Sequence, residues 1–329
     1  MNVLVTGGLG VIGSWVTRQL LEEGHRPVIY ENRTDPLLVP DIIDDLEIVI
    51  GDILDLPTLI RTMKTYRIQC VCHLAGRLGQ AAQANPWYSF QINAIGTLNV
   101  LEACRISEVE RVVFTSSKAV YAIFTGEYTY PTYKPVNEDY PLYPDAKRHG
   151  IYGTAKLTSE LLCLQYYQEY ALNYVALRFS PLYGIGRIAR HGTIAIYNKM
   201  IENAMLNKPT IIPHGGDEKT DLISVKDAAN SIVLACFSQN LEHHVFNISN
   251  SQSYKLEDFA NAVKAIFPDA VIEIGPGLDH VGIGPRYCVL DISRAKEELG
   301  FMPKYTLEEG IKDYIDTMKR LDIQPVYSP

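Results

Sequence analysis

The sequence predicts an α/β protein with a Rossmann-type, doubly wound parallel sheet and a smaller mixed α/β domain for the substrate. The first observation is a strand, a glycine-rich turn and a helix within residues 2–24. The second is that apolar segments of strand length then alternate with helical segments up to about residue 179, which is typical of a parallel sheet. Beyond this point the alternation loosens, and glycines and prolines gather. We therefore expect two interleaved domains, a sheet domain of residues 1–179 and about 221–250 that carries the glycine-rich turn, and a smaller domain of about 180–220 and 251–329.

Composition narrows the possible partners and locations. The 329 residues are 47% hydrophobic and 21% charged, with a net charge of −8. This negative charge argues against nucleic acid or an anionic membrane as a partner, since both are themselves negative. The six cysteines are not at metal-ligand spacing, so we expect no metal site. No apolar run has transmembrane length and the first strand leaves no room for a signal peptide, so we expect a cytoplasmic protein.

The opening segment carries the main binding motif. Val3–Val5 is an apolar strand, and Gly7, Gly10 and Gly13 follow it directly before a helix. Such a turn lets the backbone approach a pyrophosphate and directs a helix N-terminus at its charge. The spacing alone is a weak signal, but its position between a strand and a helix predicts a dinucleotide site. The contacts are expected from Gly7, Gly10, Val11, Ile12 and Gly13.

The second strand, Pro27–Tyr30, ends in Glu31 and Asn32. A carboxylate there accepts hydrogen bonds from the adenosine ribose and repels a 2′-phosphate, which favours NAD over NADP. Arg33 leaves the alternative open, because an arginine here accommodates that phosphate; otherwise it is a solvated loop charge.

The next two strands also end where a cofactor would pass. The third ends at Asp52 and Ile53, which we place at the adenine edge. The fourth closes in Leu74-Ala75-Gly76, small residues that suit the flat middle of a cofactor. His73 lies within this apolar strand and is interpreted as a packed core histidine.

A tyrosine and a lysine form the candidate acid/base. Tyr152 and Lys156 are four residues apart and therefore share one helical face. A nearby ammonium stabilises a phenolate and lowers the tyrosine pKa, so the pair can exchange a proton with a substrate alcohol. The strand Arg111–Ser117 stops in hydroxyls at the edge where open α/β sheets place their chemistry. We therefore expect Ser117 to lie opposite the pair.

Together these motifs resemble the short-chain dehydrogenase/reductase superfamily, and more narrowly its extended branch of NAD-dependent sugar epimerases and dehydratases, of which UDP-galactose 4-epimerase is the type. The resemblance runs from Val3 to about Tyr314 and includes Asn93–Thr97, Thr115–Tyr121, Arg178–Gly184 and Asp291–Ala295. It implies that Tyr152 is the acid/base, that Lys156 lowers its pKa and holds the nicotinamide ribose, and that Ser117 binds the reacting oxygen. The implied NAD contacts are Gly7, Gly10, Val11, Ile12, Gly13, Glu31, Asn32, Asp52, Ile53, Leu74, Ala75, Gly76, Asn93, Ser116, Tyr152, Lys156 and Phe179.

The sequence also departs from this family. Lys118-Ala119 replace the Asp-Glu of the dehydratases, so loss of water is not expected. Ser180 stands where related epimerases commonly have asparagine, and Thr220 where they have an arginine that typically grips a diphosphate. Losing such a bidentate contact weakens the grip. Arg286 does match the other phosphate arginine of the family, so a diphosphate remains one of the alternatives.

Cations concentrate near the expected substrate cleft, at Arg187, Arg190 and His191, with Lys118 as a further member. Either they hold an anionic group such as a carboxylate, or they are solvated loop charges. The expected substrate contacts are Ser117, Lys118, Ser180, Arg187, Arg190, His191 and Arg286.

The resulting functional hypothesis is a nucleotide-sugar 4-epimerase that works through a transient 4-keto intermediate. One alternative is a net NAD-dependent dehydrogenase of a free sugar, sugar acid or small hydroxy acid, favoured by Ser180 and Thr220. A remote alternative is a non-catalytic module that senses NAD(H). The helix of Tyr152 carries Tyr166, Tyr167 and Tyr170. Extended-branch relatives usually pair through this helix and the Asn93 helix, so we expect a homodimer.

Overall fold

A seven-stranded sheet forms the larger part of the molecule. The computed structural model describes residues 1–142, 150–188, 195–281 and 287–328. Within them all pairs of the large sheet are parallel, in the order β11-β6-β5-β4-β1-β2-β3. The order reverses between β1 and β4, which confirms the doubly wound Rossmann-type sheet. The strands are β1 (Asn2–Thr6), β2 (Arg26–Glu31), β3 (Glu47–Ile50), β4 (Cys70–His73), β5 (Arg111–Ser117), β6 (Asn173–Phe179) and β11 (Val245–Ile248).

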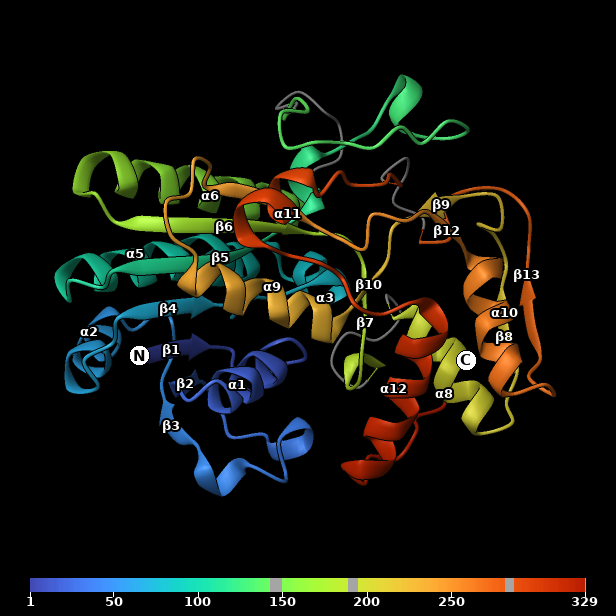
Figure 1. The fold of residues 1–329 in the computed structure, drawn as a ribbon, viewed down its shortest axis with the longest axis horizontal. Coiled ribbons are helices and arrows are strands. Elements are labelled where there is room, and N and C mark those ends of the chain that lie inside the picture. The colour runs from blue at the N-terminus through green and yellow to red at the C-terminus, as the bar shows by residue number, and fades with distance from the viewer. Residues whose placement is uncertain (143–149, 189–194, 282–286, 329) are drawn as a thin grey trace.

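Helices cover both faces of this sheet (Figure 1). One face is covered by α1 (Gly13–Glu22), α9 (Val225–Phe237) and α11 (Ser293–Leu299). The other is covered by α2 (Leu56–Thr65), α5 (Gly96–Ile106) and α6 (Gly150–Tyr170). Between β4 and α5 the chain forms α3 (Gly79–Ala84), α4 (Pro86–Phe90) and one π-helical turn, Gln91–Ile95. Residues 86–106 therefore form three consecutive helical pieces, namely α4, the π-helical turn and α5.

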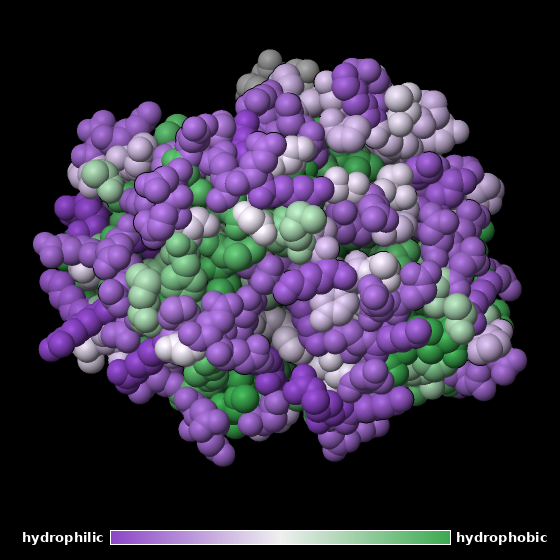
Figure 2. Space-filling view, viewed as in Figure 1, coloured by the Kyte–Doolittle hydropathy of each residue, from purple (hydrophilic) through white to green (hydrophobic). Residues whose placement is uncertain are grey.

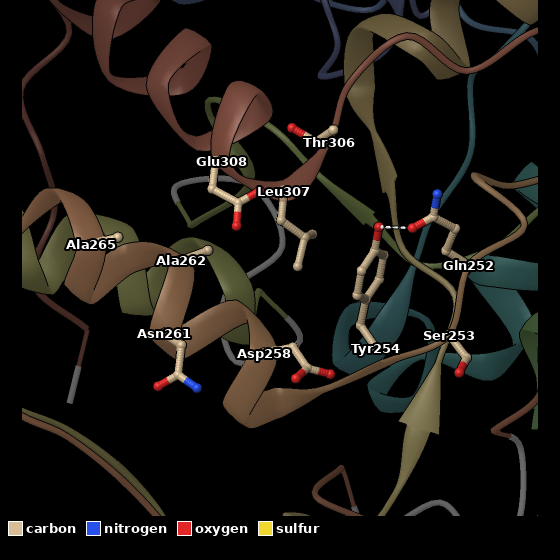
Figure 3. A pocket seen from close by; sticks show the side chains of 10 residues that line it. All are labelled: Gln252, Ser253, Tyr254, Asp258, Asn261, Ala262, Ala265, Thr306, Leu307 and Glu308. Carbon is tan, nitrogen blue, oxygen red and sulfur yellow. Dashed lines mark hydrogen bonds between the residues drawn. The ribbon is translucent and has the colours of Figure 1, made fainter.

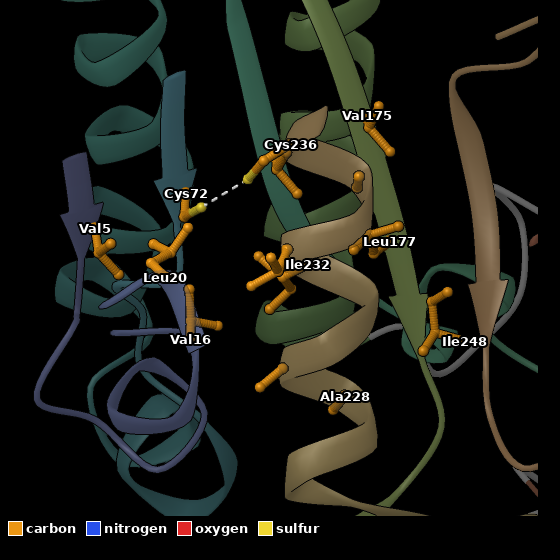
Figure 4. Close-up of a cluster of buried hydrophobic side chains, with 14 of the residues drawn as sticks. Val5, Val16, Leu20, Cys72, Val175, Leu177, Ala228, Ile232, Cys236 and Ile248 are labelled. Atoms are coloured by element: carbon orange, nitrogen blue, oxygen red, sulfur yellow. Dashed lines mark hydrogen bonds between the residues drawn. The ribbon is translucent and has the colours of Figure 1, made fainter. Parts of the chain in front are cut away.

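The core explains why the strands read as apolar runs. Val5, Cys72 and Val175 face α1 and α9, and Ile232 of α9 packs between them (Figure 4). Strands covered on both faces bury successive side chains, so they lose the polar alternation of a half-exposed strand. The helix α1 ends at Glu22, and Gly24 follows its C-cap residue with a φ of +76°, a conformation that glycine adopts readily.

A second group of elements lies to the right in Figure 1. Its helices α8 (Ile196–Met205), α10 (Leu256–Ile266) and α12 (Leu307–Arg320) share a core around Phe259 and Ile311. Three two-stranded pairs accompany them: β7 (Leu182–Tyr183) with β10 (Ile223–Ser224), β8 (Thr210–Ile212) with β13 (Ile272–Ile274), and β9 (Lys219–Thr220) with β12 (Tyr254–Lys255). The sequence leaves the sheet after β6, returns to it with α9 and β11, and leaves again, so the two groups are interleaved. The boundaries at about residues 180, 221 and 250 remain a prediction.

Polar side chains cover most of the face in Figure 2, and hydrophobic residues appear there in separate patches. A row of apolar residues is exposed on α6, where Leu161 is 59% and Tyr170 55% accessible. None of the helices in the described ranges is both long enough and apolar enough to span a membrane.

Candidate active site

The turn between β1 and α1 has no room for a side chain at Gly7 or Gly13. A Cβ on Gly13 would lie 2.1 Å from the Gly7 carbonyl oxygen, and one on Gly7 would lie 2.9 Å from the Ala75 nitrogen. Gly7 also has a φ of +77°, which disfavours other residues. The amides of Val11 and Ile12 donate no hydrogen bond within the described part of the chain. Bare backbone at a helix N-terminus is what a pyrophosphate requires, so these residues fit NAD.

The two acidic residues at the strand ends support neighbouring loops. Glu31 accepts a hydrogen bond from the Leu9 amide at 3.0 Å, which ties the carboxylate to the glycine turn. Asp52 accepts one from the Leu54 amide at 2.9 Å. Both lie at the carboxyl edge of the sheet, where the cofactor is expected. Their contacts with ribose and adenine, and those of Asn32 and Ile53, remain predictions.

His73 is a core residue, as its apolar surroundings suggested. Its ring nitrogens bond the hydroxyls of Thr6 and Thr97 at 2.7 and 3.1 Å. Burial and the nearby Lys156 ammonium lower the pKa of His73 to about 3, so the ring is neutral at physiological pH. His73 therefore links β4 to the end of β1 through Thr6 and to α5 through Thr97.

The three predicted catalytic residues come together at the end of β5. Ser117 forms a hydrogen bond with Tyr152, and this bond and the charge of Arg187 lower the tyrosine pKa. Burial outweighs both and raises the pKa of Tyr152 to about 12. The Lys156 ammonium donates to the Thr115 carbonyl at 2.6 Å, and burial lowers its pKa to about 8. A phenol, a hydroxyl and a cation therefore share one site at the carboxyl edge of the sheet.

The middle of the expected cofactor path is equally close-packed. A Cβ on Gly76 would meet the Asn93 side chain at 2.9 Å and Lys156 Nζ at 3.9 Å. The Asn93 side-chain amide accepts a hydrogen bond from the Arg77 backbone N–H and donates one to the Arg77 carbonyl. The backbone carbonyl of Asn93 accepts from the Ser159 hydroxyl at 2.9 Å. The π-helical turn is thus bonded both to the loop after β4 and to α6. Phe179, also expected near the cofactor, is buried at the end of β6.

Only some of the residues predicted to contact the substrate lie within the described ranges. Arg187 is 8% accessible, and its Nε has no hydrogen-bond partner among the described residues. Ser180 is buried, and its hydroxyl is likewise without a partner in the described ranges. Lys118 Nζ lies 3.1 Å from the Thr220 hydroxyl and 3.8 Å from an Asp221 carboxylate oxygen. Arg190, His191 and Arg286 lie outside the described residues.

A separate pocket of about 610 Å³ lies between α10 and the start of α12. Figure 3 shows its lining, including Tyr254, Asp258 and Glu308, and a hydrogen bond from the Tyr254 hydroxyl to Gln252. None of the predicted site residues lines this pocket. It therefore takes no part in the site described above.

Sequence reasoning did not identify Glu160 as part of the site. It lies one helical turn beyond Lys156, accepts a hydrogen bond from Ser116 and forms a buried ion pair with Arg178. The four-residue spacing was the available signal, since it places Glu160 on the same face as the catalytic pair.

The glycine turn on a doubly wound sheet, followed by Ser117, Tyr152 and Lys156 at one edge, defines an NAD-dependent oxidoreductase of the short-chain dehydrogenase/reductase type. The model of the NAD dependent epimerase/dehydratase family matches residues 3–249. The chain belongs to this family and is an enzyme of the extended short-chain type, with NAD as its cofactor.

Relatives and solved structures agree with this assignment. A putative UDP-glucose 4-epimerase of Methanocaldococcus jannaschii is 31% identical over 324 residues, 96% of this chain and 98% of the relative. The UDP-glucose 4-epimerase of Thermotoga maritima, solved with UDP-glucose, superposes with a TM-score of 0.81 at 26% identity, over 97% of this chain and 99% of that one. The Thermus thermophilus UDP-glucose 4-epimerase, a complex with NAD, has the same TM-score, identity and coverage.

Proposed function

We propose that the protein is a nucleotide-sugar 4-epimerase that acts through a transient 4-keto sugar. The observation that carries the proposal is the meeting of Ser117, Tyr152 and Lys156 at the carboxyl edge of a sheet that also presents the glycine turn. The relatives and solved structures named above are UDP-glucose 4-epimerases, which supports UDP-hexoses as the substrate class.

Each catalytic residue has a role that follows from its environment. Bound NAD supplies the hydride acceptor and returns the hydride in the same cycle. Tyr152 takes the proton of the C4 hydroxyl and gives it back, while Ser117 donates a hydrogen bond to the same oxygen. A phenol with a pKa near 12 is a poor base at neutral pH. The charge of Arg187 lowers the pKa of Tyr152 and so favours its phenolate form. Lys156 Nζ lies 5.8 Å from the centre of the Tyr152 ring, where its charge would add to this effect.

The test is a product assay with UDP-glucose and catalytic amounts of NAD. Formation of UDP-galactose without net NADH identifies an epimerase, because the hydride returns to the sugar. Stoichiometric NADH would overturn the proposal in favour of the dehydrogenase. Binding of NADH with no turnover of any sugar would instead favour the sensing module.

Arg187 supports a more acidic substrate within the same class. Burial lowers the pKa of Arg187 to about 10, and the phenols of Tyr152 and Tyr314 act in the opposite direction. No carboxylate of the described residues forms an ion pair with it. A buried cation of this kind is costly, and an anionic group on the sugar would compensate it. If Arg187 holds a carboxylate, Arg187→Gln raises KM for UDP-glucuronate far more than KM for UDP-glucose. Equal increases in both KM values would instead indicate that Arg187 acts on Tyr152 and does not bind the sugar.

We further propose a homodimer that pairs through α5 and α6. Leu161, Leu164, Tyr167 and Tyr170 expose apolar surface along α6, and burying this surface stabilises association. Light scattering of the wild type should give twice the chain mass, and Leu161→Asp should give the monomer. A monomeric wild type would refute this interface.

A cytoplasmic location is in keeping with six cysteines that are all unbridged and buried.

A further inference from the structure

Helix α6 and strand β5 are joined at three successive turns of the helix. Tyr152, Lys156 and Glu160 follow one another at intervals of four residues, so they project from one face of α6. Each of them bonds one of the last three residues of β5. The contacts are Ser117 with Tyr152, the Thr115 carbonyl with Lys156 at 2.6 Å, and the Ser116 hydroxyl with Glu160.

Glu160 is itself held by a two-pronged ion pair. Arg178 donates from Nε to one carboxylate oxygen at 3.0 Å and from Nη2 to the other at 2.7 Å. The side chains are 5% and 6% accessible, so the pair is screened from water. Ser116 and Arg178 are direct neighbours across β5 and β6. The strand register therefore places the hydroxyl and the guanidinium on the same carboxylate.

The guanidinium is fixed from its other side as well. Arg178 Nη1 donates to the Tyr121 hydroxyl at 3.0 Å and to the Glu138 carbonyl at 3.2 Å. The guanidinium carbon of Arg178 also lies 4.8 Å from the centre of the Tyr121 ring. Charge-assisted bonds of this kind are strong and directional, so neither Arg178 nor the carboxylate it holds can swing away.

Stability alone does not explain this arrangement. Removing two charges from water costs about as much as their attraction returns, and a hydrophobic pair of similar volume often serves as well. An ion pair also fixes the orientation of its two side chains, which a hydrophobic contact does not. Here it holds the Glu160 carboxylate toward the hydroxyl of Ser116, the neighbour of the catalytic Ser117.

We propose that Glu160 is a positioning residue, which acts through Ser116 to hold the end of β5 against α6 and keep the Ser117 hydroxyl within bonding distance of the Tyr152 phenol. The inference rests on the proposed epimerase function for its kinetic consequence. Its structural consequence, the bond between Ser117 and Tyr152, is independent of the substrate.

The test compares Glu160→Gln/Arg178→Met, which removes both charges together, with Ser116→Ala, which removes one hydroxyl. We expect the double variant to lower kcat for UDP-glucose on the order of 10- to 100-fold, since small misplacements of catalytic groups cost this much. KM and the Kd for NAD should change less than about threefold. Ser116→Ala should also lower kcat, but by a smaller factor.

Val263→Ala is the control for a general loss of stability. Val263 is buried in α10, in the core that α8, α10 and α12 share, and this core contains no described residue of β5 or α6. Its truncation therefore opens a cavity away from the contact under test. A double variant that folds and retains wild-type kcat would overturn the proposal. So would a loss of kcat in Val263→Ala that matches the double variant at the same Tm.

A second measurement separates this proposal from the proposed function. Tyrosinate absorbance is titrated in the wild type and in Ser116→Ala, each compared with its Tyr152→Phe derivative to isolate Tyr152. The proposal predicts a higher Tyr152 pKa in Ser116→Ala, because the bond from Ser117 is weakened. An unchanged value would refute the positioning role, whereas absence of epimerase activity with an altered Tyr152 pKa would refute only the proposed function.

Discussion

Gly13→Ala isolates the requirement for bare backbone in the NAD site. The new Cβ would lie 2.1 Å from the Gly7 carbonyl oxygen, whereas real Cβ contacts do not fall below 3.0 Å. The turn and α1 must therefore separate by about 0.9 Å, the difference between these two distances. Alanine improves helix propensity by about 1 kcal/mol, but a shift approaching 1 Å misplaces the amides that face the pyrophosphate. We expect the Kd for NAD to rise on the order of 100-fold, or about 2.7 kcal/mol.

Calorimetric titration with NAD measures this change, and Gly24→Ala is the matched control. A Cβ on Gly24 would meet no atom within 4 Å, but this position needs a φ of +76°. Its replacement should cost about 1–2 kcal/mol of unfolding free energy and leave the Kd for NAD unaltered. If Gly13→Ala binds NAD within about threefold of the wild type, the turn does not cradle the pyrophosphate.

Three further predictions concern protons. Tyr152→Phe should lower kcat by roughly 10²- to 10⁴-fold in the epimerase assay while NAD still binds, because only the proton-transfer group is lost. Folding lowers the pKa of Lys156 from 10.5 to about 8, so the unfolded state binds the proton more tightly. Unfolding free energy from urea titrations should therefore rise between pH 8 and 10.5, and Lys156→Met should lack this rise. Folding also lowers the pKa of His73 from 6.5 to about 3, so stability should fall as the pH drops below 6.5, and less so in His73→Gln.

The parts of the fold that follow from local patterns could be predicted from the sequence. The glycine spacing after Val3–Val5 indicated the turn, and the alternation of apolar runs indicated the doubly wound sheet. The pairing of Tyr152 with Lys156 needed only the helical repeat. Their meeting with Ser117 followed because the carboxyl ends of parallel strands share one edge of a sheet.

Contacts that depend on register or on distant segments could not be predicted in this way. The pair of Glu160 and Arg178 requires the alignment of β5 with β6, which no short pattern encodes. The contact of Lys118 with Thr220 joins residues that are 102 positions apart. The role of Glu31 in holding the Leu9 amide depends on how the glycine turn folds back over β2.

The two sides of the site treat their buried polar groups differently. The network around Glu160 is bonded on every side by protein groups, as suits a scaffold that must not move. On the substrate side, Ser180 Oγ and Arg187 Nε have no hydrogen-bond partner in the described ranges. Each such group costs about 1–3 kcal/mol while it is buried and unpaired. A hydroxyl-rich ligand that reached them would recover part of this cost, so these groups should contribute to the affinity for the sugar.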